Sequence, residues 1–304
     1  LYHSLHTRNT ILKARQLGMS TFTSMLILDN CLFEDGFQAG IIDRTDDDGK
    51  EKMQKIALAY DMLENPPRTT KDHVTDPADW EAIAAFSRVL WKRVKGDIGA
   101  VRATFTRQKG VDSLIRVATT LRGGTLNFLH VSEYGYVANN FPLRAKEIKN
   151  GAMEAVSKSN IVVIESTHEG GKTGENYRII KSAMENQGHK LDSLDYKFFF
   201  FPWYKQQEYR VIKDVPLGRT ELDPYFKELE NIGITLDDGQ KRWYLAKYKV
   251  LGDSIKQEYP STPDEALSSN IEGAIYGSII SRIRSLGQVA ADFETDPYAP
   301  LYVS

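Results

Sequence analysis

The sequence has a single cysteine and no long apolar run. Cys31 is the only thiol among 304 residues, which excludes an intramolecular disulfide, and no Cys/His cluster has the spacing of a zinc site. The longest run of aromatic residues, at positions 198–201, is far shorter than the roughly 20 apolar residues of a membrane-spanning helix. These absences favour a protein of a reducing, intracellular compartment that has no membrane partner.

An excess of one charge sign is also missing. The chain carries 39 basic and 41 acidic residues, so it lacks the global charge signature of a nucleic-acid-binding protein, although a local basic face is compatible with this balance. Hydrophobic residues at 41% and charged residues at 26% exclude the disordered and collagen-like classes. The length predicts two domains, or one core with a substantial appendage.

What the sequence does contain is an alternation of apolar strands and helices. We predict buried strands and amphipathic helices at the following positions: strands 8–14, 37–43, 160–167 and 195–203, and helices 20–33, 45–65 and 80–94. Residues 113–133 are predicted to form a β-hairpin that turns at Gly123 and Gly124. Apolar strands separated by helices indicate an α/β fold with a largely parallel sheet that is covered on both faces. From about residue 205 the chain becomes more polar and helical.

The segment KARQLGMST, which begins at Lys13, has the outline of a phosphate-binding loop. A Walker A motif has Gly, four residues and then Gly-Lys-Ser/Thr, because backbone N–H groups surround the phosphates, the lysine neutralises them and the hydroxyl binds Mg²⁺. Gly18 and Ser20 match, whereas Lys13 takes the first glycine position and Met19 the lysine position. Lys13 or Arg15 could supply the missing cation from the other end of the loop. An ordinary strand-to-helix turn with a serine cap is the alternative.

Two further strands end in residues suited to phosphate chemistry. LNFLHVSE has the apolar run of a Walker B strand and ends in Glu133, while Ser132 stands where the metal-side aspartate is usual and could hold a metal-bound water. In IVVIESTHEGG, Ser166 and Thr167 follow a buried strand and could sense a γ-phosphate, because strand ends converge on the ligand in such sheets. The alternatives are that Glu133 is merely a solvated glutamate and that Ser166 and Thr167 only cap the end of their strand.

Five segments in order, KARQLGMST, LRGGTLNFLHVSEYG, IVVIESTHEGG, FFFFPWYKQQEYR and QEYPSTPDEAL, resemble the ATPase region of the large terminase subunit of tailed bacteriophages, the motor that packages DNA into capsids. The resemblance runs from about residue 8 to 270, and its specificity comes from the ordered set. It implies a P-loop NTPase of the ASCE type, with a mainly parallel sheet flanked by helices and a smaller helical lid or linker subdomain.

The resemblance also implies roles for individual residues. Glu133 would be the catalytic carboxylate, Arg122 an arginine that acts in trans on the ATP of a neighbouring subunit, and Ser166 to His168 the motif that couples hydrolysis to DNA movement. Catalytic or phosphate contacts are expected from the loop: Lys13, Arg15, Gln16, Gly18, Met19, Ser20 and Thr21. Ser20 and Ser132 are the expected Mg²⁺ ligands, and Ser166 and Thr167 complete the ATP site.

On this interpretation residues 1–204 form the ATPase core, 205–296 the lid or linker subdomain, and 297–304 the start of a truncated nuclease domain, with an adenine-contacting segment upstream. The implied partners are double-stranded DNA, a portal protein, a small terminase subunit and copies of the chain itself in a ring, in the cytoplasm of an infected bacterium. Two rival functions remain: a helicase-like or other P-loop nucleic-acid translocase, and a catalytically silent nucleotide-binding scaffold subunit.

Overall fold

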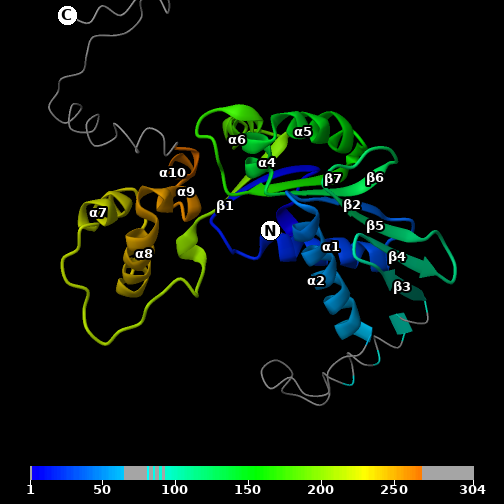
Figure 1. Cartoon of the computed structure of the whole chain (residues 1–304), viewed down its shortest axis with the longest axis horizontal. Helices are drawn as coiled ribbons and strands as arrows, with labels where there is room; N and C mark the ends of the chain where they lie inside the picture. The colour runs from blue at the N-terminus through cyan, green and yellow to red at the C-terminus, as the bar shows by residue number, and fades with distance from the viewer. Residues whose placement is uncertain (1, 65–80, 82–84, 86–88, 91–92, 269–304) are drawn as a thin grey trace, which may run out of the picture. The chain divides into compact units, whose positions relative to one another are not determined.

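The computed structural model describes residues 2–64, 81, 85, 89–90 and 93–268, and its centre is a sheet with the strand order β3-β4-β5-β2-β6-β7-β1-β8 (Figure 1). The strands are β1 (Arg8–Lys13), β2 (Gln38–Ile42), β3 (Val94–Ile98), β4 (Arg102–Arg107), β5 (Ser113–Ala118), β6 (Leu126–Ser132), β7 (Val156–Ser166) and β8 (Tyr196–Phe201). From β5 to β8 in this order all neighbours are parallel, while β3 and β4 extend one edge as an antiparallel pair. The mainly parallel sheet expected from the sequence is confirmed.

Helices cover both faces of the sheet (Figure 1). The helices of this part are α1 (Met19–Phe33), α2 (Asp46–Glu64), α4 (Tyr134–Asn140), α5 (Pro142–Glu147), a π-helical turn (Ile148–Met153) and α6 (Gly174–Glu185). The core between the sheet and α1 and α2 contains Phe128 and Val163, whereas Leu129 and Val162 belong to the core under α4 and α5. Successive residues of one strand therefore face opposite helical layers, as strand geometry requires.

The hairpin predicted at 113–133 is wrong. β5 and β6 both pair with β2, and Ala39 of β2 lies opposite Ile115 on one side and Phe128 on the other. Since all three strands are parallel, the connection 119–125 is a crossover between strands separated by β2. Gly123 and Gly124 do have positive φ values, 73° and 79°, so the local turn signal is real but does not bring the flanking strands together.

Residues 203–268 pack around an aromatic core. This part contains the short helical turns Trp203–Lys205 and Gly252–Ser254 and the helices α7 (Asp223–Asn231), α8 (Asp238–Leu251), α9 (Ile255–Glu258) and α10 (Pro263–Leu267). Trp203 is fully buried, stacks on Trp243 with ring centroids 5.2 Å apart, and donates its indole N–H to Ser261 Oγ at 2.9 Å. Ala14 and Leu17 of the predicted phosphate-binding loop pack against the same cluster.

Some sequence predictions fall outside the described ranges. Most of the segment 80–94 and all of 269–304, with the expected start of a nuclease domain, are among them. The domain boundaries after residues 204 and 296 stay predictions. Within the described ranges, no helix combines the length and the apolar character needed to span a membrane.

Candidate active site

The carboxyl ends of β1, β6 and β7 meet at a polar cleft of about 220 Å³. Ligands of open α/β sheets bind at this edge. The lining comes from the loop after β1, the start of α2, the end of β6 and the segment after β7, and it comprises Lys13, Arg15, Gln16, Ser20, Asp43, Arg44, Asp48, Glu51, Lys52, Lys55, Ser132, Glu133, Tyr136, Thr167 and Glu169. Most of the residues predicted from the sequence are therefore brought together.

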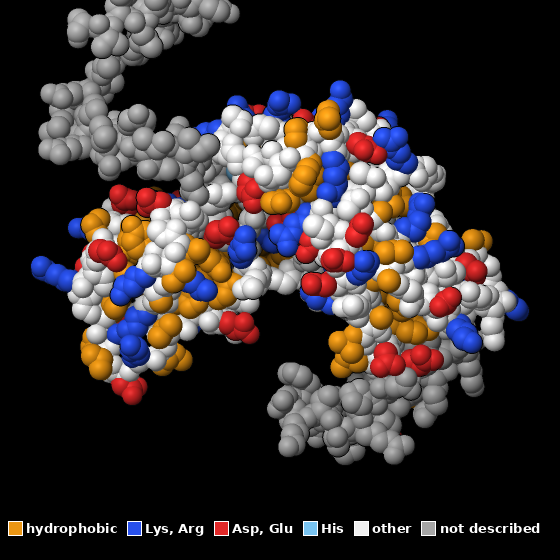
Figure 2. Space-filling view, in the orientation of Figure 1, with side chains coloured by type: hydrophobic (Ala, Val, Ile, Leu, Met, Phe, Trp, Pro, Cys, Tyr) orange, Lys and Arg blue, Asp and Glu red, His pale blue; other side chains and the backbone are white. Residues whose placement is uncertain are grey.

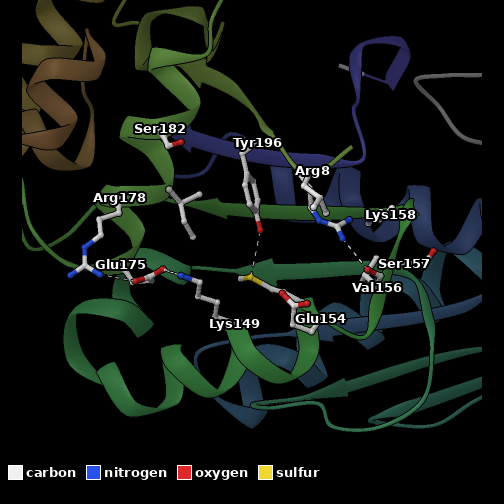
Figure 3. A pocket seen from close by; sticks show the side chains of 13 residues that line it. Arg8, Lys149, Glu154, Val156, Ser157, Lys158, Glu175, Arg178, Ser182 and Tyr196 are labelled. Carbon is white, nitrogen blue, oxygen red and sulfur yellow. Dashed lines mark hydrogen bonds and ion pairs between the residues drawn. The ribbon is translucent and has the colours of Figure 1, made fainter. Parts of the chain in front are cut away.

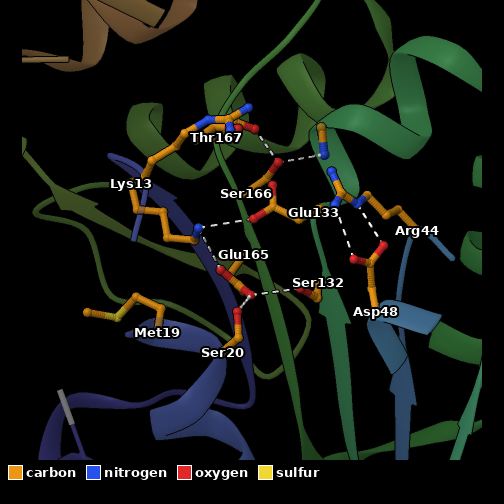
Figure 4. Close-up of polar contacts among 12 residues, drawn as sticks. Lys13, Met19, Ser20, Arg44, Asp48, Ser132, Glu133, Glu165, Ser166 and Thr167 are labelled. Atoms are coloured by element: carbon orange, nitrogen blue, oxygen red, sulfur yellow. Dashed lines mark hydrogen bonds and ion pairs between the residues drawn. The ribbon is translucent and has the colours of Figure 1, made fainter. Parts of the chain in front are cut away.

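Strand alternation explains which side chains reach the floor of the cleft. In the register of the sheet, Glu165 of β7 lies opposite Ser132 of β6 and opposite Ile11 of β1. Lys13 is two residues beyond Ile11 and so points to the same face, toward the first turn of α1. Figure 4 shows the side chains of Lys13, Glu165 and Ser132 converging with that of Ser20.

Lys13 bridges two carboxylates. Its Nζ lies 3.2 Å from Glu133 Oε1 and 3.2 Å from Glu165 Oε2, and its side chain is only 6% exposed. Burial on its own would lower the pKa of Lys13, but the charges of Glu165 and Glu133 and the hydrogen bonds to them raise it above the ordinary value. Lys13 is therefore held as an ammonium group at the end of the loop opposite to the usual Walker lysine.

Glu165 is a functional candidate that the sequence reasoning missed. It is wholly buried, and it accepts hydrogen bonds from Ser132 Oγ at 2.9 Å and from Ser20 Oγ. Burial opposes its ionisation, yet the charge of Lys13 and hydrogen bonds from neighbours including Ser20 hold the pKa of Glu165 well below its usual range. The sequence does contain a signal for Glu165, which is an acid inside the apolar run NIVVIE. Its side chain is on the same face of the sheet as that of Ser132 on the neighbouring strand.

Glu133 stands at the mouth of the cleft in a strained backbone conformation. Its φ is 50° and its ψ 40°, and Gln16 on the opposite wall has φ 55°. Non-glycine residues rarely adopt this left-handed region, and such residues cluster at functional sites. Burial raises the pKa of Glu133, and the nearby Lys13 opposes the shift only in part. A raised pKa suits a carboxylate that accepts a proton from water.

The loop uses its residues differently from a strict Walker A motif. Gly18, at φ 73°, is the N-cap of α1, and Met19 turns its side chain away from the carboxylates (Figure 4) toward the hydrophobic core. The Arg15 guanidinium is 54% exposed and pairs with Glu258 of α9, so the structure does not bring it to the Lys13 cluster. Thr21 is exposed in the first turn of α1.

Ser166 and Thr167 point to different sides of the cleft wall. Thr167 lines the cleft, whereas Ser166 Oγ accepts a hydrogen bond of 2.9 Å from the Gly135 backbone N–H. A Cβ added at Gly135 would lie 2.5 Å from the Thr167 carbonyl oxygen, so the segment after Glu133 packs tightly on this motif. The next residue, His168, accepts a 2.7 Å hydrogen bond at its backbone oxygen from Gln257 of α9.

Arg122 lies outside this cleft. It is in the crossover between β5 and β6, its side chain is 74% exposed, and its Nε lies 2.7 Å from Glu147 Oε1. The predicted role in trans therefore stays a prediction. The three acids at 46–48 form the first turn of α2, where negative charge is favourable to the helix dipole, and Asp48 also pairs with Arg44 in the cleft wall. Arg44 and the Asp43–Lys52 ion pair are cleft residues that the sequence reasoning missed.

The oxygen atoms on the cleft floor fit Mg²⁺. This ion prefers oxygen ligands and is usually held by one or two carboxylates together with substrate phosphates and water. The hydroxyls of Ser20 and Ser132 both approach Glu165 Oε1, and the other carboxylate oxygen of Glu165 is buried and pairs with the Lys13 ammonium at 3.2 Å. No cluster of three or more His, Cys, Asp or Glu residues suited to a metal occurs in the described part of the chain.

A larger hollow, of about 620 Å³, lies at the opposite edge of the sheet (Figure 3). It opens near Arg8, Val156 and Tyr196, the first residues of β1, β7 and β8. Its charged groups are largely engaged with one another or with the backbone: Glu175 pairs with Lys149 and with Arg178, and Arg8 donates to the Val156 carbonyl at 2.9 Å. The carboxyl-edge cleft is therefore the stronger candidate for nucleotide chemistry.

Comparison with solved structures identifies the fold. The ATPase domain of the large terminase of Thermus phage P74-26 superposes with a TM-score of 0.53 at 15% sequence identity, over 85% of this chain and 89% of that domain. A mutant of the same domain gives 0.51 at 15% identity, over 84% and 89%. The large terminase of another thermophilic bacteriophage is matched over 65% of this chain and 41% of its own, with a TM-score of 0.39 at 11% identity. Neither a protein-family model nor a curated protein sequence matches. The chain thus has the fold of a P-loop ATPase domain.

Proposed function

We propose that this chain is a magnesium-dependent ATPase whose hydrolysis of ATP drives the translocation of double-stranded viral DNA into a procapsid. The observation that carries the proposal is the position of Lys13 between Glu133 and Glu165, beside the first turn of α1, at the ligand-binding edge of the sheet. The fold shared with a terminase ATPase domain supports the choice of motor, and the ordered sequence motifs support it independently.

In this proposal the loop and α1 bind the phosphates. Backbone N–H groups around Gly18 and the positive end of the α1 dipole face an anion in the cleft, as at other phosphate sites. Lys13 replaces the Walker lysine, and Arg15 and Gln16 of the loop and Thr21 of the first turn of α1 are the further proposed phosphate contacts. Mg²⁺, when bound, would neutralise phosphate charge, and the hydroxyls of Ser20 and Ser132 are suited to hold it.

Glu133 orients and deprotonates the attacking water. In the described arrangement it is engaged with Lys13 at 3.2 Å. Phosphate oxygens compete for the same ammonium group, which leaves the Glu133 carboxylate available to water. The tight contact of Gly135 with the Thr167 carbonyl oxygen and the Ser166 hydroxyl then connects the catalytic strand end to the predicted coupling motif, and the His168 contact with Gln257 continues to α9.

DNA, a portal protein, a small terminase subunit and a ring of copies are proposed partners. Basic and acidic side chains are interspersed on the face shown in Figure 2. Two basic residues near the helices after β6 are engaged within the chain: Arg144 donates to backbone carbonyls of Thr119 and Arg44, and Lys149 pairs with Glu175. The basic residues of α8, among them Lys241 and Lys249, are the candidates that we propose for contact with DNA phosphates.

DNA-dependent ATP turnover tests this proposal and separates it from its rivals. Long duplex DNA should stimulate turnover, and the stimulation should fall steeply between about 50 and 200 mM salt because phosphate contacts release counterions. Strand separation on a tailed duplex would indicate a helicase-like motor instead. Tight ATP binding without turnover, with any DNA and at any protein concentration, would indicate the scaffold subunit.

A further inference from the structure

A buried acid that contacts the cleft residues Lys13, Ser20 and Ser132 matches a gap in the Walker B motif. In P-loop NTPases a hydroxyl of the loop and an acid at the end of the Walker B strand hold the metal together. Here the Walker B strand β6 ends in Ser132 followed by Glu133, so the metal-side position carries no carboxylate. Glu165 lies directly opposite Ser132 on the adjacent strand β7 and is wholly buried.

The contacts of Glu165 are those expected of a metal-side acid. Its Oε1 accepts from the hydroxyl of Ser20, the loop residue at the metal-ligand position, and from the hydroxyl of Ser132 at 2.9 Å. Its Oε2 pairs with the Lys13 ammonium at 3.2 Å. His130 Nε2, on the same strand face, lies 3.4 Å from Oε1. An ionised carboxylate in such a site is costly without compensating groups, and three of those present, Lys13, Ser20 and Ser132, line the cleft.

We propose that Glu165 supplies the metal-side carboxylate of this ATPase, from the strand next to the one that normally carries it. The Ser132 hydroxyl, proposed above to hold Mg²⁺, then also positions the Glu165 carboxylate across the β6–β7 pair. The inference rests on the proposed function, because it assigns the metal end of the same ATP site. On this inference the metal-side acid has moved from β6 to β7, and Ser132 occupies the position that the acid usually takes.

The test moves the acid back to β6. The affinity for a fluorescent ATP analogue is measured with and without Mg²⁺, and bound Mn²⁺ is followed by electron paramagnetic resonance, so that neither readout depends on turnover. The variants are Glu165→Gln and the double variant Ser132→Asp/Glu165→Gln. Glu265→Gln is the matched control, because Glu265 of α10 is a partly buried carboxylate outside the cleft that accepts from Ser261 N at 2.7 Å. Thermal melts establish that each variant is folded.

Glu165→Gln should lower the affinity for the metal–nucleotide complex by about 10- to 100-fold and leave metal-free binding unchanged or stronger. The double variant should regain most of the loss, and the control should behave as the parent. A Glu165→Gln variant that keeps the parent's metal effect would overturn the inference while the proposed function stands. An equal loss of metal-free binding would assign Glu165 a structural role and overturn it as well. A parent that binds no nucleotide would refute both.

Discussion

Replacing Lys13 with methionine should strongly destabilise the fold. The ammonium lies 3.2 Å from carboxylate oxygens of both Glu133 and Glu165, and the side chain is 6% exposed. Methionine keeps an unbranched apolar stem but removes the charge. Glu165 then remains wholly buried beside a second carboxylate with no ammonium between them. Removing one partner of a buried ion pair costs about 3–5 kcal/mol.

Thermal melts without nucleotide measure this cost. For a unit of this size, each kcal/mol corresponds to a shift of about 2–4 °C, so the melting temperature should fall by roughly 6–20 °C. The double variant Lys13→Met/Glu165→Gln should recover most of the loss, because it removes the uncompensated charge together with its partner. The recovery distinguishes an electrostatic effect from a packing defect, which a second substitution would not repair.

The pH dependence of the melts gives a second signature. In the parent, Lys13 holds the folded-state pKa of Glu165 below its unfolded-state value. This stabilisation is present above the unfolded-state pKa and is lost as the pH falls through the folded-state pKa. In Lys13→Met, burial without the ammonium raises the folded-state pKa, so the variant loses stability as the pH rises. The difference in melting temperature between the parent and Lys13→Met should therefore be larger at about pH 8 than at about pH 5. A variant within about 1 kcal/mol of the parent at both pH values would refute the reasoning.

The remaining predictions concern the coupling contact and the ring. Gly135→Ala should lower the stability of the fold by about 1–3 kcal/mol and reduce turnover more than nucleotide affinity. The reason is that the added Cβ would lie 2.5 Å from the Thr167 carbonyl oxygen and displace Glu133. Thermal melts and kinetics compare it with the control Gly151→Ala, whose Cβ would meet its nearest atom at 3.7 Å. An unchanged Gly135→Ala would contradict the tight contact. Arg122→Ala should lower the ATP turnover of concentrated protein by about 10³-fold while nucleotide binding is retained. Mixing this variant with Glu133→Gln should restore part of the turnover, because each variant supplies the residue that the other lacks. Full activity of Arg122→Ala alone would contradict a role of Arg122 in a ring.

Much of the fold could be predicted from the sequence, because apolar strands and amphipathic helices differ in their hydrophobic period. β1, β2, β7 and β8 lie close to the predicted ranges, as do α1 and α2, and α7 and α8 lie in the part after residue 205 that was predicted to be helical. Strand neighbours were harder to predict. Gly123 and Gly124 have the φ values of a turn, but the insertion of β2 between β5 and β6 depends on tertiary packing that local turn chemistry does not encode.

The candidate site was predictable where a motif specifies position along the chain. Lys13, Ser20, Ser132 and Glu133 were named from spacing, and the structure brings all four to one cleft. Glu165 was missed because the motif logic followed each strand separately. Its role depends on the β6–β7 register, which places it opposite Ser132, and register is a property of strand pairing rather than of either segment alone.

The central claim is that this cleft binds ATP and that Glu133 activates the attacking water. The most direct measurement compares magnesium-dependent ATP turnover and ATP-analogue affinity for the parent, Glu133→Gln and Glu185→Gln, the last changing an exposed carboxylate of α6. Glu133→Gln should bind as the parent does and hydrolyse about 10²- to 10⁴-fold more slowly, while Glu185→Gln behaves as the parent. Equal turnover in Glu133→Gln, or a parent that neither binds nor hydrolyses ATP when concentrated with duplex DNA, would contradict the account.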